Sequence, residues 1–275
     1  MSARHISMRH PPPLKAAAPR RGNGALAWVC AAVLASPAAY AASEAVKQAW
    51  LVRASADLDP RALAALTQIS GSERRLLALR AYLRAGGALE ARWSWSREQL
   101  AAYPSSAEGK AAAADIDAVI AAFASANPGF TLRANRLPRN LEVQIAHWNE
   151  NRSVGVAAAA LVASLERRFG SAPGAPDALA LRRALMDWTP DPPPALAAPG
   201  LSPHGQARAF DFQIERNGKL VAGTEAASAR QQWDAAGWTQ KLHAAVGAAG
   251  NRFTGPLASP YEPWHYAYLH TPAAP

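Results

Sequence analysis

The chain has 275 residues and half of them are hydrophobic, which suffices for one substantial buried core and excludes disorder as the default interpretation. Its formal net charge is +9, but five cations and no acid lie in the first 41 residues, so the remainder carries 24 basic and 20 acidic residues. A net charge of +4 without clustering excludes nucleic acid as the expected partner.

Residues 1–41 have the pattern of a secretory signal peptide. A basic stretch precedes an apolar run from Ala25 to Leu34, and Ala39-Tyr40-Ala41 supplies a small-x-small cleavage signal. The apolar run is shorter than the roughly 20 residues of a membrane span, so we expect no stable span after cleavage. The pattern predicts export to the periplasm or the extracellular space. Arg20-Arg21 leaves a twin-arginine export route as the alternative.

The cysteine content limits the chemistry of the exported chain. Cys30 is the only cysteine, and it lies within the predicted signal peptide. The mature chain would then have neither a disulfide nor a thiol nucleophile. Any metal ion would have to be held by His, Asp and Glu side chains.

Residues 42–105 are predicted to form a helical amino-terminal region. Apolar residues recur at helical spacing, which indicates two to four short helices, and Asp59-Pro60 is typical of a helix start. Trp93 and Trp95 cannot share a helix face. Packing in a core or between domains is the favoured interpretation, and a ligand-stacking platform is the alternative. No catalytic constellation is recognised in this region.

The next segment, which opens a predicted domain over residues 106–275, alternates helices with one short strand. The expected elements are a helix ended by Asn127-Pro128-Gly129, a strand from Phe130 to Arg133, a helix through Ile145 and Trp148, and an alanine-rich helix to about Phe169. His147 falls within the second of these helices, where a structural role is favoured over metal ligation. Residues 170–200 are rich in proline and predict either a linker or an ordered surface loop.

Candidate metal ligands follow this proline-rich stretch. Phe210, Phe212 and Ile214 alternate with polar residues, which predicts a strand with its aromatic face in the core and Asp211 on the other face. His204 lies seven residues before Asp211, so strict alternation would separate them. We therefore expect His204 in a bend before the strand. Asn217-Gly218 then predicts a hairpin and an antiparallel sheet.

A second candidate stretch lies near the end of the chain. Trp264, Tyr266 and Tyr268 alternate with His265, so an extended chain would bury the aromatic side chains and leave the imidazole on the opposite face. Glu262 lies three residues before His265. A histidine with a neighbouring glutamate fits a hydrolytic zinc site, provided that two further ligands exist. His243 and His270 are rival ligands, the first predicted on a solvent-facing helix and the second at a fraying terminus.

These two stretches together resemble a known family, the zinc D-alanyl-D-alanine carboxypeptidases of the vancomycin-resistance type. That family's pattern is S-x-H-x6-D followed downstream by E-x-W-H, and its fold is shared with lysostaphin-type endopeptidases and the hedgehog amino-terminal domain. The matching residues here are Ser202, His204, Asp211, Glu262, Trp264 and His265, and Arg139 and Gln144 match a further arginine and glutamine. The resemblance covers roughly residues 108 to 270. One departure is Ala207, where the family usually has glycine.

The resemblance implies a fold and a set of roles. The expected fold class is α+β, with a small antiparallel sheet that carries the zinc site, flanking helices and a helical amino-terminal extension. His204, Asp211 and His265 would hold Zn²⁺ and leave the fourth position to water, with Glu262 as general base. Arg139 would bind the substrate's terminal carboxylate or the developing oxyanion, and Gln144 and Ser202 would hydrogen-bond the peptide.

The predicted function is therefore that of an exported zinc peptidase acting on peptidoglycan stem peptides, most simply as a D,D- or L,D-carboxypeptidase. One alternative is an endopeptidase of the same fold, which an open groove beyond Arg139 would favour. The other is a non-catalytic wall-binding protein that keeps the zinc fold and uses Trp93 and Trp95 for contact. Glu262 argues against the second alternative, because a binding protein needs no general base.

Overall fold

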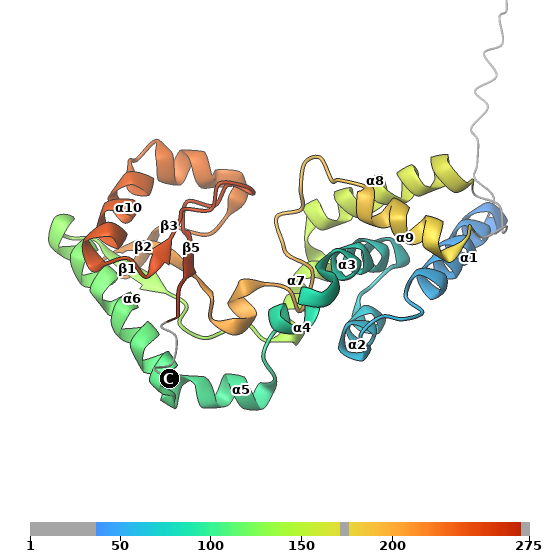
Figure 1. Ribbon diagram of the computed structural model, residues 1–275. Coiled ribbons are helices and arrows are strands. Elements are labelled where there is room, and N and C mark those ends of the chain that lie inside the picture. The colour runs from blue at the N-terminus through green and yellow to red at the C-terminus, as the bar shows by residue number, and fades with distance from the viewer. Residues whose placement is uncertain (1–36, 171–175, 271–275) are drawn as a thin grey trace, which may run out of the picture. The chain divides into compact units, whose positions relative to one another are not determined.

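The computed structural model describes residues 37–170 and 176–270, and its fold is α+β, as predicted (Figure 1). The predicted signal peptide lies outside the described residues except for 37–41. The α-helices are α1 (Pro37–Ala54), α2 (Pro60–Gln68), α3 (Ser72–Ala85), α4 (Leu89–Arg92), α5 (Arg97–Ala102), α6 (Ala107–Ala126), α7 (Leu141–Glu150), α8 (Arg152–Phe169), α9 (Ala178–Asp187) and α10 (Trp238–Ala249). The short helical turns are η1 (Gly86–Ala88), η2 (Tyr103–Ser105), η3 (Pro203–Gln206), η4 (Ala226–Ser228) and η5 (Arg230–Asp234), the last a π-helical turn.

A small antiparallel sheet has the strand order β1-β2-β5-β4, and β3 pairs with β2 as a hairpin. The strands are β1 (Thr131–Ala134), β2 (Ala209–Arg216), β3 (Lys219–Ala222), β4 (Phe253–Thr254) and β5 (His265–Tyr268). Asn217 and Gly218 both have positive φ angles, 52° and 72°, as the predicted two-residue hairpin turn requires. The sheet therefore places the two candidate stretches, in β2 and β5, on neighbouring strands.

One hydrophobic cluster combines α1, α2 and α3 with α7, α8 and α9. Its largest fully buried side chains include Trp50, Trp148 and Tyr82, and Trp93 joins them from the end of α4. Leu161 and Leu165, one turn apart, both face the interior of this cluster from α8. Segments before and after residue 105 thus contribute to one core. The division into a helical region over residues 42–105 and a domain over residues 106–275 stays a prediction.

The second hydrophobic cluster covers the sheet. Helix α6 packs against both α10 and β1, and its apolar stripe of Ile116, Val119 and Phe123 is buried. Phe212 and Tyr266 meet edge to face across β2 and β5, with ring centroids 6.0 Å apart. The aromatic face of β2 is therefore the core face, as the alternation predicted.

Two helical segments differ from the sequence prediction. Between Ser43 and Tyr103 the structure has five α-helices or parts of them, where two to four were expected. The helices α4 and α5 are short and have no apolar stripe of their own, so hydrophobic periodicity does not predict them. Within residues 170–200, α9 interrupts the proline-rich stretch. Leu181, Ala184 and Leu185 form a buried i, i+3, i+4 stripe that the surrounding prolines obscured.

The packing of the sheet yields a testable stability difference between two leucines on its strands. Leu132 on β1 is 4% exposed, whereas Leu220 on β3 is 59% exposed. Replacing a buried leucine with alanine costs about 2–5 kcal/mol through lost contacts and the cavity that remains. We expect Leu132→Ala to lose that much unfolding free energy in urea titrations and the matched Leu220→Ala to lose less than about 1 kcal/mol. Equal losses would contradict this packing.

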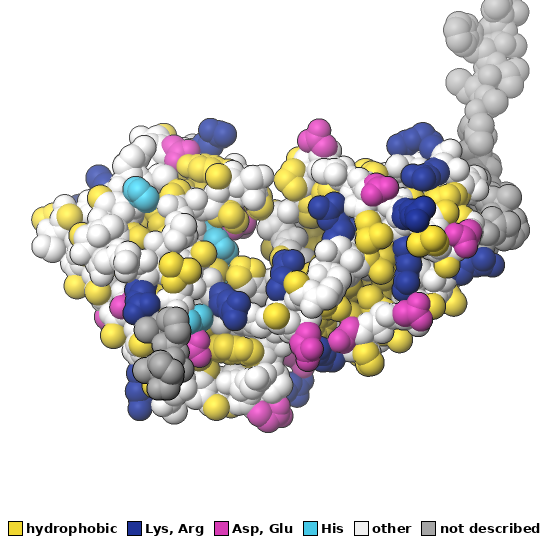
Figure 2. Space-filling model, in the orientation of Figure 1, with side chains coloured by type: hydrophobic (Ala, Val, Ile, Leu, Met, Phe, Trp, Pro, Cys, Tyr) yellow, Lys and Arg dark blue, Asp and Glu magenta, His cyan; other side chains and the backbone are white. Residues whose placement is uncertain are grey.

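The surface carries both charge signs. On the face shown in Figure 2, lysine and arginine side chains are interspersed with aspartate and glutamate rather than gathered in one patch. Among the described residues, no helix has the length and hydropathy needed to cross a bilayer.

Candidate metal centre

The strand register brings two of the predicted ligands together. Asp211 on β2 and His265 on β5 are direct cross-strand partners, so their side chains project from the same face of the sheet. That face is opposite to the one that buries Phe210 and Tyr266. His265 Nδ1 lies 3.1 Å from Asp211 Oδ1.

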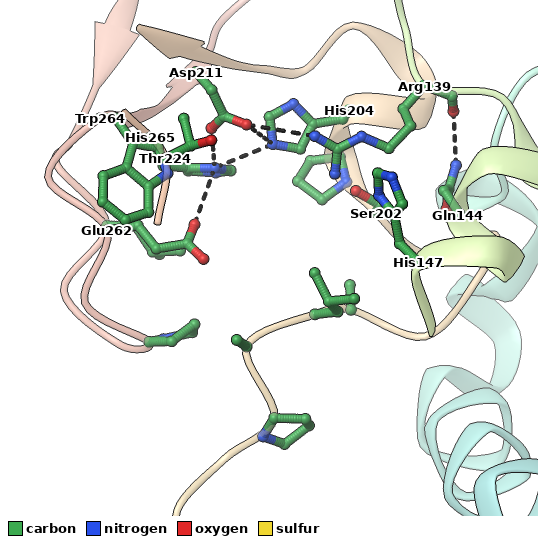
Figure 3. A pocket seen from close by; sticks show the side chains of 17 residues that line it. Arg139, Gln144, His147, Ser202, His204, Asp211, Thr224, Glu262, Trp264 and His265 are labelled. Carbon is green, nitrogen blue, oxygen red and sulfur yellow. Dashed lines mark hydrogen bonds and ion pairs between the residues drawn. The ribbon is translucent and has the colours of Figure 1, made fainter. Parts of the chain in front are cut away.

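The third predicted ligand, His204, comes from the turn η3 immediately before β2, as the sequence indicated. Its Nε2 lies 3.1 Å from His265 Nδ1 and 3.5 Å from Asp211 Oδ2. Figure 3 shows the three side chains pointing toward one another. They form a group of three side chains that could hold a metal ion, the one such group in residues 37–170 and 176–270.

The three side chains are close enough to share one metal ion. With one ligand atom taken from each residue, the three atoms all lie within 4.8 Å of one another. The two imidazole nitrogens are 3.1 Å apart, near the separation of about 3.3–3.4 Å between ligands of a tetrahedral zinc ion, and Asp211 offers one oxygen to each histidine. Two imidazole nitrogens and one carboxylate suit zinc, and the same donor set also accepts other divalent transition metals such as Fe²⁺. The geometry therefore indicates a metal site without deciding which metal occupies it.

The surroundings also favour the protonation states that bind metal. Burial lowers the pKa of His204 to about 4, helped by the nearby positive charges, so its imidazole is neutral at pH 7. For Asp211, burial alone would raise the pKa, but the hydrogen bond from His265 and the neighbouring histidine and arginine charges lower it below its ordinary value. A neutral imidazole and an ionised carboxylate are the forms that ligate metal ions.

Glu262 lies beside the three candidate ligands but does not belong to the metal group. Its Oε2 is 3.5 Å from His265 Nδ1, and its side chain is 15% exposed. The carboxylate comes from a turn closed by hydrogen bonds that join Leu257 both to Glu262 and to His265. Burial raises the pKa of Glu262 to about 7, and the negative charge of Asp211 adds to the effect. A carboxylate with a pKa near neutrality can accept a proton and return it.

All of the predicted site residues line one cavity of about 490 Å³. Arg139 points toward the metal group, with Nη2 3.5 Å from Asp211 Oδ2 (Figure 3). Ser202 is buried at the wall of the cavity, next to η3. His147 also lines the cavity; its side chain is exposed, which differs from the structural role that the sequence favoured, and it lies outside the metal group.

Gln144 lines the same cavity, yet its amide is engaged by the protein itself. Nε2 donates to Ser94 Oγ at 2.8 Å and to the Arg139 carbonyl at 2.7 Å, and Oε1 accepts from Gly200 N at 2.9 Å. These contacts use both N–H groups of the amide. They favour a role in fixing the backbone of Arg139 over the predicted contact with a peptide substrate.

The rival ligands and the paired tryptophans lie elsewhere. His243 is exposed on α10, as expected, and His270 Nδ1 lies 2.6 Å from Glu108 Oε1, packed against the protein rather than fraying. Trp93 belongs to the first hydrophobic cluster, and Trp95 packs against the second. The favoured interpretation, packing between the two cores, matches this placement better than an exposed stacking platform.

Ala207, at the one departure from the motif described above, has a backbone conformation that glycine adopts more easily. Ala207 ends η3 with φ 53° and ψ 26°, in the left-handed region, and it is buried. A residue with a Cβ pays about 1–2 kcal/mol for that conformation, which glycine avoids. The chain thus keeps the turn that joins His204 to β2 with alanine in the glycine position.

One part of the cavity lining was not predicted from the sequence. This apolar wall consists of Pro194, Ala195, Leu196 and Ala197, which line the same cavity as the metal group. Their only sequence signal was the proline content of residues 170–200. A hydrogen bond from Ala195 N to Ser153 Oγ, 2.9 Å long, ties this wall to the start of α8.

The fold and the site together define an α+β protein with a largely buried His-Asp-His group able to hold a metal ion. Comparisons with protein-family models, curated proteins and solved structures found no match.

Proposed function

We propose that the protein is an exported zinc peptidase that hydrolyses peptidoglycan stem peptides as a D,D- or L,D-carboxypeptidase. The observation that carries this proposal is the placement of Glu262, whose carboxylate lies 3.5 Å from His265 Nδ1 and lines the same cavity as all three candidate ligands. Three metal ligands with a neighbouring free carboxylate are the composition of a hydrolytic centre rather than of a structural one. The motif resemblance supports the same class of substrate.

The chain's own residues supply acid–base chemistry and orientation. Zinc held by His204, Asp211 and His265 would act as a Lewis acid that lowers the pKa of water and polarises a carbonyl group. Glu262 takes a proton from the attacking water while the oxygen of that water bonds to the peptide carbonyl carbon. The same carboxyl group then returns the proton to the amine nitrogen as the C–N bond breaks. Burial raises the pKa of this carboxyl group, which favours its acceptance of a proton.

Arg139 and the apolar wall account for substrate selection. The Arg139 guanidinium faces the cavity beside the metal group and would pair with a terminal carboxylate or with the oxyanion that forms during attack. In the same cavity, Ala195 and Leu196 offer a surface suited to small methyl-bearing side chains such as those of alanine. Both features favour a peptide that ends in alanine.

A second cavity favours substrates longer than a dipeptide. It has a volume of about 590 Å³ and shares four lining residues with the first, namely Ala195, Leu196, Thr224 and Glu262. A peptide bound at Glu262 therefore has room to continue away from Arg139. This space suits the upstream part of a stem peptide, and it also keeps an endopeptidase of the same fold as the second candidate.

Product analysis separates the candidates. We expect the zinc-loaded protein to release single D-alanine residues from intact sacculi or isolated muropeptides, which mass spectrometry detects as a loss of one alanine. Shorter cross-linked fragments without free alanine would instead identify an endopeptidase. Binding to sacculi without any cleavage, with one equivalent of zinc bound, would overturn the enzymatic proposal in favour of a wall-binding protein.

A further inference from the structure

The segment Ala91–Trp95, which comprises the end of α4 and part of its connection to α5, contacts the turn that carries His204. Trp95 N donates to the Gly205 carbonyl at 2.9 Å. In the other direction, Gln206 Nε2 donates to the carbonyls of Ala91 and Trp93 at 3.0 and 2.7 Å. The two residues that directly follow His204 are therefore both bound to this segment of the helical amino-terminal region.

Ser94 lies at the centre of these contacts. Its backbone N–H donates to the Gly200 carbonyl at 2.8 Å, and its Oγ accepts from Gln144 Nε2. The approach to η3 is so close that a Cβ on Gly205 would lie 2.0 Å from Ser94 Oγ. Only glycine fits at position 205 while serine occupies position 94, and both residues are buried.

The same network reaches Arg139. Its backbone N–H donates to the His204 carbonyl at 2.9 Å, and its own carbonyl accepts from Gln144 Nε2. A continuous chain of hydrogen bonds thus runs from His204 through Arg139 and Gln144 to Ser94. Because the participating polar groups are buried, breaking one link leaves unpaired donors or acceptors that cost about 1–3 kcal/mol, and the backbone would shift to recover them.

We propose that Ala91–Trp95 is a positioning element for the metal centre, with Ser94 and Gln206 as positioning residues that hold His204 and Arg139 in register. The amino-terminal helical region would thereby have a role in the site. The role of Arg139 in binding substrate rests on the proposed function. Its consequence for His204 concerns metal binding alone. Residues that orient metal ligands typically change metal affinity or activity by about 10- to 100-fold when they are replaced.

Zinc affinity measured by chelator competition tests the proposal, at a temperature where circular dichroism shows each variant to be folded. We expect Gln206→Ala and Gly205→Ala each to weaken zinc binding by about 10- to 100-fold and to shift the visible absorption bands of the Co²⁺-substituted protein. Leu181→Ala is the control, since it removes a fully buried side chain of the first cluster that lies outside the network. It should lower thermal stability while leaving zinc affinity and the Co²⁺ spectrum unchanged.

A compensating pair strengthens the test. Ser94→Gly removes the two closest atoms that a Cβ at position 205 would meet, at 2.0 and 2.7 Å, and leaves Gln144 Nε2 at 2.8 Å. It also removes the hydroxyl to which Gln144 donates. The double variant with Gly205→Ala should therefore be more stable to heat than Gly205→Ala alone, yet still bind zinc more weakly than the wild type. If Gly205→Ala does not fold, Gln206→Ala and Ser94→Ala test the proposal. Wild-type zinc affinity in Gln206→Ala would overturn it. Weakened zinc binding in a protein that cleaves no peptide would refute the proposed function and leave this inference standing.

Discussion

Replacing Glu262 with glutamine is expected to lower the rate of muropeptide hydrolysis by about 10²- to 10⁴-fold, the usual contribution of a general base. Glutamine keeps the size of the side chain but cannot take a proton from water. The three candidate ligands are untouched, so the variant should still bind one equivalent of zinc. Hydrolysis followed by chromatography of the products, together with metal analysis, measures both quantities on one sample.

The matched control for this variant is Glu150→Gln. Glu150 is exposed at the end of α7 and lines neither cavity, so its replacement should leave the rate unchanged. Wild-type hydrolysis by zinc-loaded Glu262→Gln would rule out the general-base role. Loss of zinc from that variant would show instead that the Glu262 carboxylate belongs to the ligand set.

His265→Ala is expected to abolish zinc binding at micromolar metal concentrations. His265 Nδ1 lies within 3.1 Å of ligand atoms from both His204 and Asp211, so its loss opens one corner of the site and leaves only two ligands. A ligand that binds only the folded state stabilises it by about 2.7 kcal/mol at 100 times its dissociation constant. Zinc should therefore raise the melting temperature of the wild type and leave that of His265→Ala unchanged.

His243→Ala provides the matched control, because this histidine is exposed on α10 and belongs to no metal group. It should keep one equivalent of zinc and the full thermal shift. Treatment of the wild type with a chelator should reproduce the low melting temperature of His265→Ala. A full equivalent of zinc in His265→Ala would mean that the ligand set is wrong, and a different metal in the wild type would redirect the proposed chemistry.

The register of β2 with β5 and the helix α9 are two features that sequence patterns did not predict. Alternation predicted β2 and β5 separately, but it carries no information about which residue of one strand faces which residue of the other. The pairing of Asp211 with His265 depends on the register, which packing of the aromatic core face sets. Similarly, the apolar stripe of α9 was hidden by surrounding prolines until its burial against other helices could be seen.

The local features of this protein could be predicted from its sequence. The fold class, the bend at His204, the Asn217-Gly218 hairpin and the facing of Asp211 away from the aromatic core all follow from near neighbours in the chain, whose geometry is governed by local sterics and periodicity. The ligand set could be predicted because its residue types and spacing match a known motif.

How these local features combine became evident from the three-dimensional fold. It assembled the metal group from η3, β2 and β5, engaged Gln144 within the protein, and placed Ser94 against Gly205 behind His204. The contacts of Asp211 with His265, of Gln144 with Ser94 and of Ser94 with Gly205 join residues 50 to more than 100 positions apart. They depend on close packing and on the pairing of buried polar groups. Neither of these can be read from the order of residues along one chain.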